Sequence, residues 1–180
     1  EGLARRTGLV ANERGAELLG CTRVGDDAGQ GGLEDFEDHE GVVVVLGDAL
    51  DDAPEDFASN ATLVVYLGAY VSSTLASADF QFPVTTFAEQ EGTFTNHAGR
   101  VQRFWPALSG PGAARPAWFV LGAFLGALQD EEGPSKAADA FGLVAESVKS
   151  YEGLDYETIG TQGGPSGANL PVVGDARSGD

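Results

Sequence analysis

The stretch that decides the fold is GVVVVLGDALDDAPEDFASNATLVVYLG, residues 41–68. It holds two apolar runs, Val42–Leu46 and residues 63–67, separated by a polar segment. Four consecutive valines show no polar alternation, which is typical of a parallel strand buried on both faces. Pro54, followed by Glu55 and Asp56, predicts that a short helix joins the two strands. Strand, helix and strand in this order indicate a right-handed βαβ unit.

The rest of the chain extends this pattern. We expect a helical turn in YVSSTLASA, residues 70–78, and a short strand at FQFPV, residues 80–84. Pro116 precedes AWFVLGAFLGAL, which predicts a buried helix whose glycines Gly122 and Gly126 allow close backbone approach. Ser135 is expected to cap a last helix that runs to about Ser150. Its predicted apolar stripe is Ala138, Phe141, Val144, Ala145 and Val148.

The predicted fold class is therefore α/β, a mainly parallel sheet with flanking helices. We expect residues 1–150 to form one such domain and residues 151–180, rich in Gly, Pro and polar residues, to form an extended or mobile tail. The chain contains no methionine, so either the translation start was removed or the chain is a piece of a longer product, and we expect it to be incomplete by itself.

The charge excludes some classes of partner. Asp and Glu number 28 against 10 Lys and Arg, which gives a formal net charge of -18. Such a surface repels nucleic acid and anionic lipid. The acids are spread along the chain, which favours adaptation to high salt over a single acidic tail. No apolar run reaches the length of a membrane span and no signal-peptide core is visible, so we expect a soluble chain.

Metal and nucleotide chemistry find little support in the sequence. Cys21 is the only cysteine, and with His39 and His97 it supplies too few ligands, too far apart, for a predicted metal site. The glycine cluster at residues 29–32 precedes its strand, whereas a phosphate loop would follow one. The hydroxyls of residues 72–74 follow a strand, but an ordinary helix cap explains them better than an anion site. We predict no catalytic residue.

The stretch EGTFTNHAGRVQRF, residues 91–104, is the strongest candidate for a binding site. It concentrates two arginines in an acidic chain. We expect a strand, a turn over residues 96–99 and a second strand that places Arg100 and Arg103 on opposite faces. Two arginines on opposite faces do not form one anion clamp, so we expect them to pair with Glu89, Glu91 or other acids. We interpret the stretch as structural.

Residues 78–108, ADFQFPVTTFAEQEGTFTNHAGRVQRFWPAL, resemble a segment of molybdopterin oxidoreductases, usually of the form ADVVLPAATFAEKDGTFTNTEGRVQ. Gly99 ahead of Arg100, the ARPAWFVLGAFLGAL continuation and the early ANERGAELLG are more similar to the large iron–sulfur subunit of complex I, the proton-pumping NADH:quinone oxidoreductase. The matching positions are Ala78, Asp79, Pro83, Thr86, Phe87, Ala88, Glu89, Gly92, Thr93, Phe94, Thr95, Asn96, Gly99, Arg100, Val101 and Gln102.

The resemblance implies a scaffold. Complex I subunits of this type generally keep the molybdopterin-enzyme fold without the molybdenum cofactor. It therefore implies no cofactor in this chain, iron–sulfur clusters in an N-terminal region outside it, and partners among the peripheral-arm subunits on the cytoplasmic side of the inner membrane. The family's ETA triplet appears here as Ser73, Thr74 and Leu75, so a contact of that Glu is missing.

Two alternatives stay open. One is a molybdopterin-binding piece of a formate dehydrogenase-like enzyme, for which Gly92, Thr93, Asn96 and Arg100 would be the first cofactor-binding candidates. The other is a free-standing interaction module.

Overall fold

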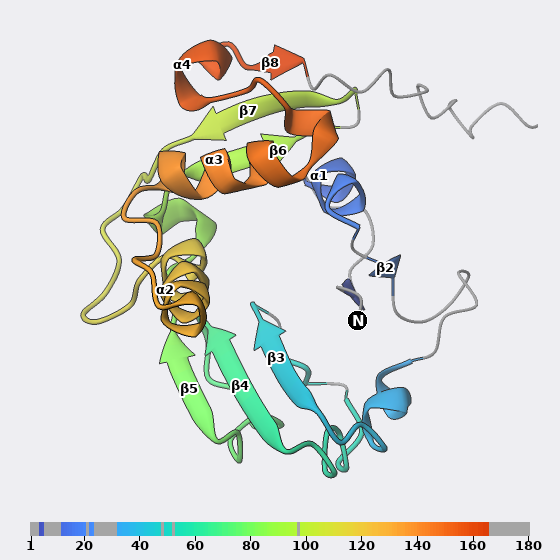
Figure 1. Cartoon of the computed structure of the whole chain (residues 1–180). Helices are drawn as coiled ribbons and strands as arrows, with labels where there is room; N and C mark the ends of the chain where they lie inside the picture. The colour runs from blue at the N-terminus through green and yellow to red at the C-terminus, as the bar shows by residue number, and fades with distance from the viewer. Residues whose placement is uncertain are drawn as a thin grey trace, which may run out of the picture. The chain divides into compact units, whose positions relative to one another are not determined.

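The structure is a computed structural model that describes residues 4–5, 12–20, 22–23, 32–47, 49–51, 53–96 and 98–165. The described residues fall into two compact units, each built from separate parts of the sequence (Figure 1). Unit 1 comprises Glu1–Thr22, Glu91–Trp105 and Pro134–Asp180, and unit 2 comprises Arg23–Gln90 and Pro106–Gly133. The sequence led us to expect one domain over residues 1–150.

The elements follow one another as strands and helices, with short 3-10 turns (η) between them. They are β1 (Ala4–Arg5), α1 (Glu13–Leu18), β2 (Thr22–Arg23), η2 (Leu33–Phe36), β3 (Val42–Leu46), β4 (Leu63–Gly68), β5 (Phe80–Pro83), η3 (Phe87–Glu89), β6 (Gly92–Thr95), β7 (Arg100–Phe104), α2 (Ala117–Gln129), α3 (Ala137–Ser147), η4 (Lys149–Tyr151), α4 (Tyr156–Ile159) and β8 (Gly164–Pro165).

Unit 2 contains a three-stranded parallel sheet in the order β3-β4-β5, which confirms the predicted α/β class. The valine-rich sequences of β3 and β4 suit a pleated, packed surface. The described residues between β3 and β4 form no helix, because Pro54 opens a series of turns instead. The prediction of a short helix there is therefore wrong. Residues 70–78 likewise form turns.

The prediction that β3 is buried on both faces is also wrong. Val43 and Val45 are buried, but Val42, Val44 and Leu46 remain about half exposed. Of the described strands in this sheet, β4 is the one largely buried on both sides. The reason is that α2 packs on β4 and β5, where Val65, Leu67 and Val84 contact its residues Ala117, Val120, Leu121 and Phe124.

Helix α2 confirms the predicted position but not the predicted burial. Gly126 is its only buried residue among those described, and Leu128 is largely solvent-exposed. A Cβ on Gly126 would lie 2.6 Å from the carbonyl oxygen of Glu131, because the chain turns back over the helix at residues 131–133. The expected close backbone approach therefore exists, and its partner is the loop that follows the helix.

Unit 1 is an antiparallel sheet, β6-β7-β8, covered by α3 (Figure 1). Its core gathers Val101 from β7, Phe141 from α3, and the C-terminal residues Tyr151 and Ile159. The amphipathic stripe of α3 is confirmed for Phe141, Val144, Ala145 and Val148, which belong to this core, but not for Ala138. Lys136, not Ser135, is the N-cap residue of α3, and the carboxylate of Asp139 three residues later accepts its N–H.

The sequence led us to expect an extended or mobile tail from residue 151. The structure differs over residues 151–165, which carry α4 and β8. Asp155 begins α4 by accepting the N–H groups of Glu157 and Thr158. Ile159 is 2% exposed, so this segment completes the core of unit 1. Residues 166–180 lie outside the described residues.

Candidate functional site around the residue 92–104 hairpin

Residues 92–104 form the predicted strand, turn and strand. β6 pairs antiparallel with β7, with Thr95 opposite Val101 and Gly92 opposite Phe104. Asn96 closes the turn, because its side-chain oxygen accepts the N–H groups of Ala98 and Arg100. An asparagine that bonds its own following backbone is typical of a tight turn. The side-chain amide nitrogen of Asn96 faces Gln102 Oε1 at 3.5 Å.

Arg100 holds the C-terminal segment against the hairpin. Its Nε and Nη2 donate to the carbonyl oxygen of Gln162 at 2.9 and 2.7 Å, and Nη2 also donates to the Gly163 carbonyl oxygen at 2.7 Å. Hydrogen bonds from a charged donor are stronger than neutral ones. These bonds supply the polar contact that brings β8 beside β7.

The remaining two candidates of this stretch have packing roles. A Cβ on Gly92 would lie 2.9 Å from the ring of Phe104, which stacks on Phe94 at a centroid distance of 4.6 Å. Glycine therefore allows the aromatic pair to close. Thr93 lies opposite Arg103 in the ladder and is partly exposed. Hydroxyl and backbone donors here are arranged along a paired strand.

Thr95 joins three separated parts of unit 1. Its N–H donates to Asn12 Oδ1 at 2.7 Å, and its hydroxyl lies 2.9 Å from the Tyr151 hydroxyl. Burial raises the pKa of Tyr151, and the hydrogen bond with Thr95 offsets part of that rise. Asn12 belongs to the early ANERGA segment, so the two stretches that carried the family resemblance meet at this residue.

Arg103 contacts aromatic rings among the described residues and not the acids that the sequence led us to expect. Its guanidinium lies over the rings of Tyr156 at 4.2 Å and Trp105 at 5.0 Å, and Nη1 donates to the Tyr156 carbonyl oxygen at 3.2 Å. Aromatic faces attract a guanidinium through their quadrupole. Burial, and then the negative charge of Glu91, raise the pKa of Tyr156 to about 12, although Arg103 opposes the rise. Glu89 is engaged elsewhere, since it accepts the Thr86 N–H.

The hydroxyls after β4 bond backbone groups, in turns and not in the helix that the cap interpretation assumed. Ser72 Oγ donates to the Ala49 carbonyl oxygen and accepts the Leu75 N–H. Thr74 Oγ1 donates to the Leu50 carbonyl oxygen at 2.9 Å. These bonds link the loop after β4 to the loop after β3, and they leave neither side chain directed at a ligand.

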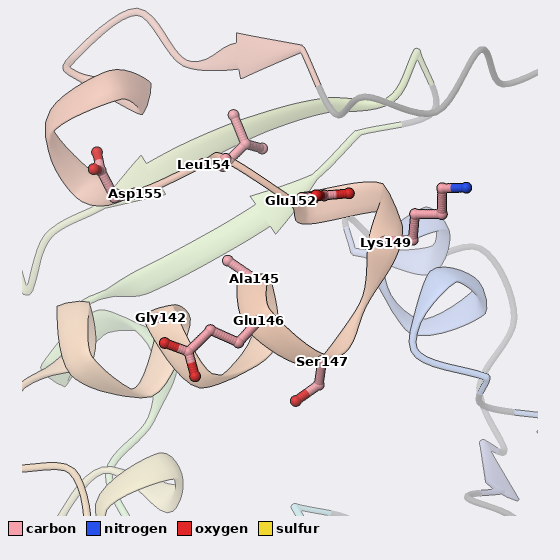
Figure 2. Close-up of a pocket in the computed structure, with 9 residues that line it drawn as sticks. Gly142, Ala145, Glu146, Ser147, Lys149, Glu152, Leu154 and Asp155 are labelled. Atoms are coloured by element: carbon pink, nitrogen blue, oxygen red, sulfur yellow. The ribbon is translucent and has the colours of Figure 1, made fainter.

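A pocket of about 710 Å³ lies beside α3 in unit 1 (Figure 2). Its walls come from the end of α3, from η4 and from the segment before α4. Glu146, Glu152 and Asp155 bring carboxylates to it, beside the basic side chain of Lys149. The Asp155 carboxylate already caps α4, and the hydrogen bonds from Thr158 hold the pKa of this carboxyl below its usual value. The pocket is open and acidic, which does not suit a pterin phosphate.

The described residues offer neither a metal centre nor a membrane span. No group of three or more His, Cys, Asp or Glu side chains lies close enough together there to hold a metal ion. No helix in that part of the chain has the length and apolarity to cross a bilayer. Cys21 and His97, two of the three possible ligands in the sequence, lie outside the described residues.

Comparison with known proteins identifies the family. Residues 7–127 match molybdopterin oxidoreductase. The chain belongs to the molybdopterin oxidoreductase family. The match spans β3 to β5 and the hairpin, so the resemblance of residues 78–108 is confirmed at the level of the family.

Similar proteins fall into two groups. The chain is 34% identical over 97 residues to F420-dependent formate dehydrogenase 2 subunit alpha of Methanococcus maripaludis, 52% of this chain and 14% of that protein. It is 31% identical over 104 residues to the putative formate dehydrogenase YrhE of Bacillus subtilis, 58% of this chain and 11% of that protein. It is 32% identical over 130 residues to an NADH-quinone oxidoreductase subunit of Rhizobium meliloti, 68% of this chain and 15% of that protein.

The chain therefore spans only about a seventh or less of these relatives. The sequence did not predict the roles of three side chains, those of Asn12, Tyr151 and Tyr156, nor the backbone carbonyl groups that bond Arg100. Asn12 lay within a stretch of the resemblance, which was the one available signal. The others lie more than fifty residues from their partners, and no local pattern marks such a pairing.

Proposed function

We propose that this chain is a non-redox scaffold portion of the peripheral arm of a complex I-type NADH:quinone oxidoreductase. The observation that carries this proposal is that the candidate cofactor-binding residues contact other parts of the protein itself. Arg100 bonds two backbone carbonyl oxygens, Asn96 closes a turn, and Gly92 admits the ring of Phe104. These residues do not fit a molybdopterin cradle, which would need their donors directed at a ligand.

The alignment supports the same assignment. The NADH-quinone oxidoreductase subunit aligns over 130 residues, against 97 and 104 for the two formate dehydrogenases. On this proposal residues 1–150 are the C-terminal part of a molybdopterin-oxidoreductase-like region. The iron–sulfur clusters belong to another region of the subunit, and the partners are the other peripheral-arm subunits. The chain then lies on the cytoplasmic side of the inner membrane, with electrons passing from NADH to quinone elsewhere in the complex.

The second candidate function is the molybdopterin-binding portion of a formate dehydrogenase-like enzyme. The similarity to formate dehydrogenases in two organisms favours it, with identities of 34% and 31%. In that case Gly92, Thr93, Asn96 and Arg100 are the first residues to examine for contacts with the pterin. A stand-alone interaction module is the third candidate.

Metal and pterin analysis of the complete natural protein separates these functions. The variant is Arg100→Ala and its matched control is Arg103→Ala, on the opposite face of the same strand. On the scaffold proposal the natural protein holds no stoichiometric molybdenum or pterin. Arg100→Ala then lowers the free energy of unfolding by about 1 to 2 kcal/mol, because the carbonyl groups of an exposed segment lose a charged donor.

The opposite result is equally clear. Stoichiometric molybdopterin that is lost in a folded Arg100→Ala protein, and kept in Arg103→Ala, overturns the scaffold proposal and supports the formate dehydrogenase-like function. The gene sequence adds a further criterion. Ferredoxin-type cysteine motifs upstream, together with genes for membrane subunits, support the complex I assignment. A catalytic cysteine or selenocysteine supports the alternative, and a start codon directly before Glu1 supports the stand-alone module.

A further inference from the structure

The uncovered strip of unit 2 is formed by Val42, Val44 and Leu46 on β3. In a parallel ladder, residues at matched positions share a face, and these three are matched with Leu63, Val65 and Leu67 of β4. Val65 and Leu67 are buried under α2, whereas the β3 residues are 57, 49 and 49% exposed. Among the residues that the structure describes, one face of the sheet is thus covered over β4 and β5 and open over β3.

The size of a helix explains where the cover stops. A helix with its side chains is about 10 Å wide, and neighbouring strands lie about 4.8 Å apart, so one helix covers about two strands. Figure 1 shows β3 at the edge of the sheet and α2 on the side of β5. The three side chains extend over about 13 Å along β3, which corresponds to roughly two and a half helical turns.

We propose that a second helix packs on this strip, beside α2, and covers β3. The helix belongs to another segment of a long molybdopterin oxidoreductase-type polypeptide. The inference rests on the proposed function, in which the chain is one part of a larger subunit. The relatives support such an occupant, because the aligned region makes up only 14, 11 and 15% of them.

The chemistry of the strip selects an apolar partner. Val42, Val44 and Leu46 have aliphatic side chains without charge or hydrogen-bonding groups, in a chain whose formal net charge is -18. A second copy of the chain would bring the same charge to the interface and be repelled. An apolar helix face meets no such penalty, and burying aliphatic side chains is favourable in proportion to the area covered.

Cysteine labelling of the complete natural polypeptide tests the inference. Val44→Cys and Leu143→Cys are made separately in a background without reactive native cysteines, and their rates of reaction with a maleimide are compared. Leu143 on α3 is the matched control, because it is 46% exposed against 49% for Val44. Rates in denaturant give the fully accessible reference for both positions.

We expect Val44→Cys to react at least a hundredfold more slowly than Leu143→Cys in the native polypeptide, and at a similar rate in denaturant. Reaction of Val44→Cys within tenfold of Leu143→Cys in the native state overturns the inference. Protection that disappears on dilution also overturns it, since the cover is then a second copy. If the natural polypeptide proves to contain no further segment, the proposed function fails before the labelling begins, so the two failures are distinguishable.

Discussion

The buried hydroxyl pair of Thr95 and Tyr151 provides a quantitative test of how the hairpin is held. The two oxygens lie 2.9 Å apart, and the residues are only 3 and 4% exposed. Thr95→Val and Tyr151→Phe each remove one hydroxyl and keep nearly the same side-chain shape. Each single change leaves the other hydroxyl buried without this partner.

The expected magnitudes follow from that geometry. A buried polar group that loses its partner costs about 1 to 3 kcal/mol, so each single variant should lose that much of its free energy of unfolding. Removing both hydroxyls can be nearly neutral, since no unpaired group remains. The double variant should therefore be no less stable than either single one, with a coupling energy of about 1 to 3 kcal/mol.

Urea unfolding of the four proteins, analysed by linear extrapolation, measures this cycle. Thr93→Val is the control, because it makes the same substitution two residues earlier at a partly exposed position, and it should change stability by about 0.5 kcal/mol or less. Additive effects within about 0.5 kcal/mol would show that the two hydroxyls act independently and would refute the reasoning.

Two further predictions concern helix packing and alkaline stability. Gly126→Ala should lower the melting temperature, because its Cβ would meet the Glu131 carbonyl oxygen. Gly142→Ala on α3 should instead stabilise the protein by up to about 1 kcal/mol, because a Cβ there meets nothing and alanine has the higher helix propensity. Destabilisation by both substitutions would contradict this reasoning. The pKa of Tyr156 is raised from 10.0 to about 12, so the unfolded chain ionises first and the free energy of unfolding should fall as the pH rises from 10 to 12. Tyr156→Phe should reduce that decline in a pH series of urea unfolding, and an identical decline in both proteins would refute the role of Tyr156.

The strands were predictable from sequence because their cause is local. Val42–Leu46 carries its β preference in its own side chains, and Asn96 and Gly99 mark the hairpin turn. Burial of β3 was not predictable in the same way, since it depends on which strands α2 covers. The helix predicted at Pro54 failed because the segment is short, and a helix of only one or two turns is marginal by itself. The turns that form instead place Phe57 and Ala58 in or against the core of unit 2.

In the candidate site, too, local features were predictable and contacts between distant residues were not. The alternation of Arg100 and Arg103 across the two faces of a strand follows from the period of two, and the structure has that arrangement. Their partners could not be inferred from nearby acids, because Arg100 bonds carbonyl groups 62 and 63 residues away. The helix and strand in residues 151–165 were also missed because their partners are distant in sequence. Helix α4 is held by contacts with β7, which the composition of residues 151–165 does not reveal.

The two units alternate along the sequence, and this alternation limits where the chain can be truncated and in what order it can fold. The polypeptide passes from one unit to the other after residues 22, 90, 105 and 133, so neither unit is a continuous segment. During synthesis the parallel sheet of unit 2 can close on α2 once Gln129 has emerged, while the hairpin must wait for Ile159. Any truncation that removes Tyr151 and Ile159 would therefore leave β6 and β7 without the residues that complete their core, however far upstream the hairpin itself lies.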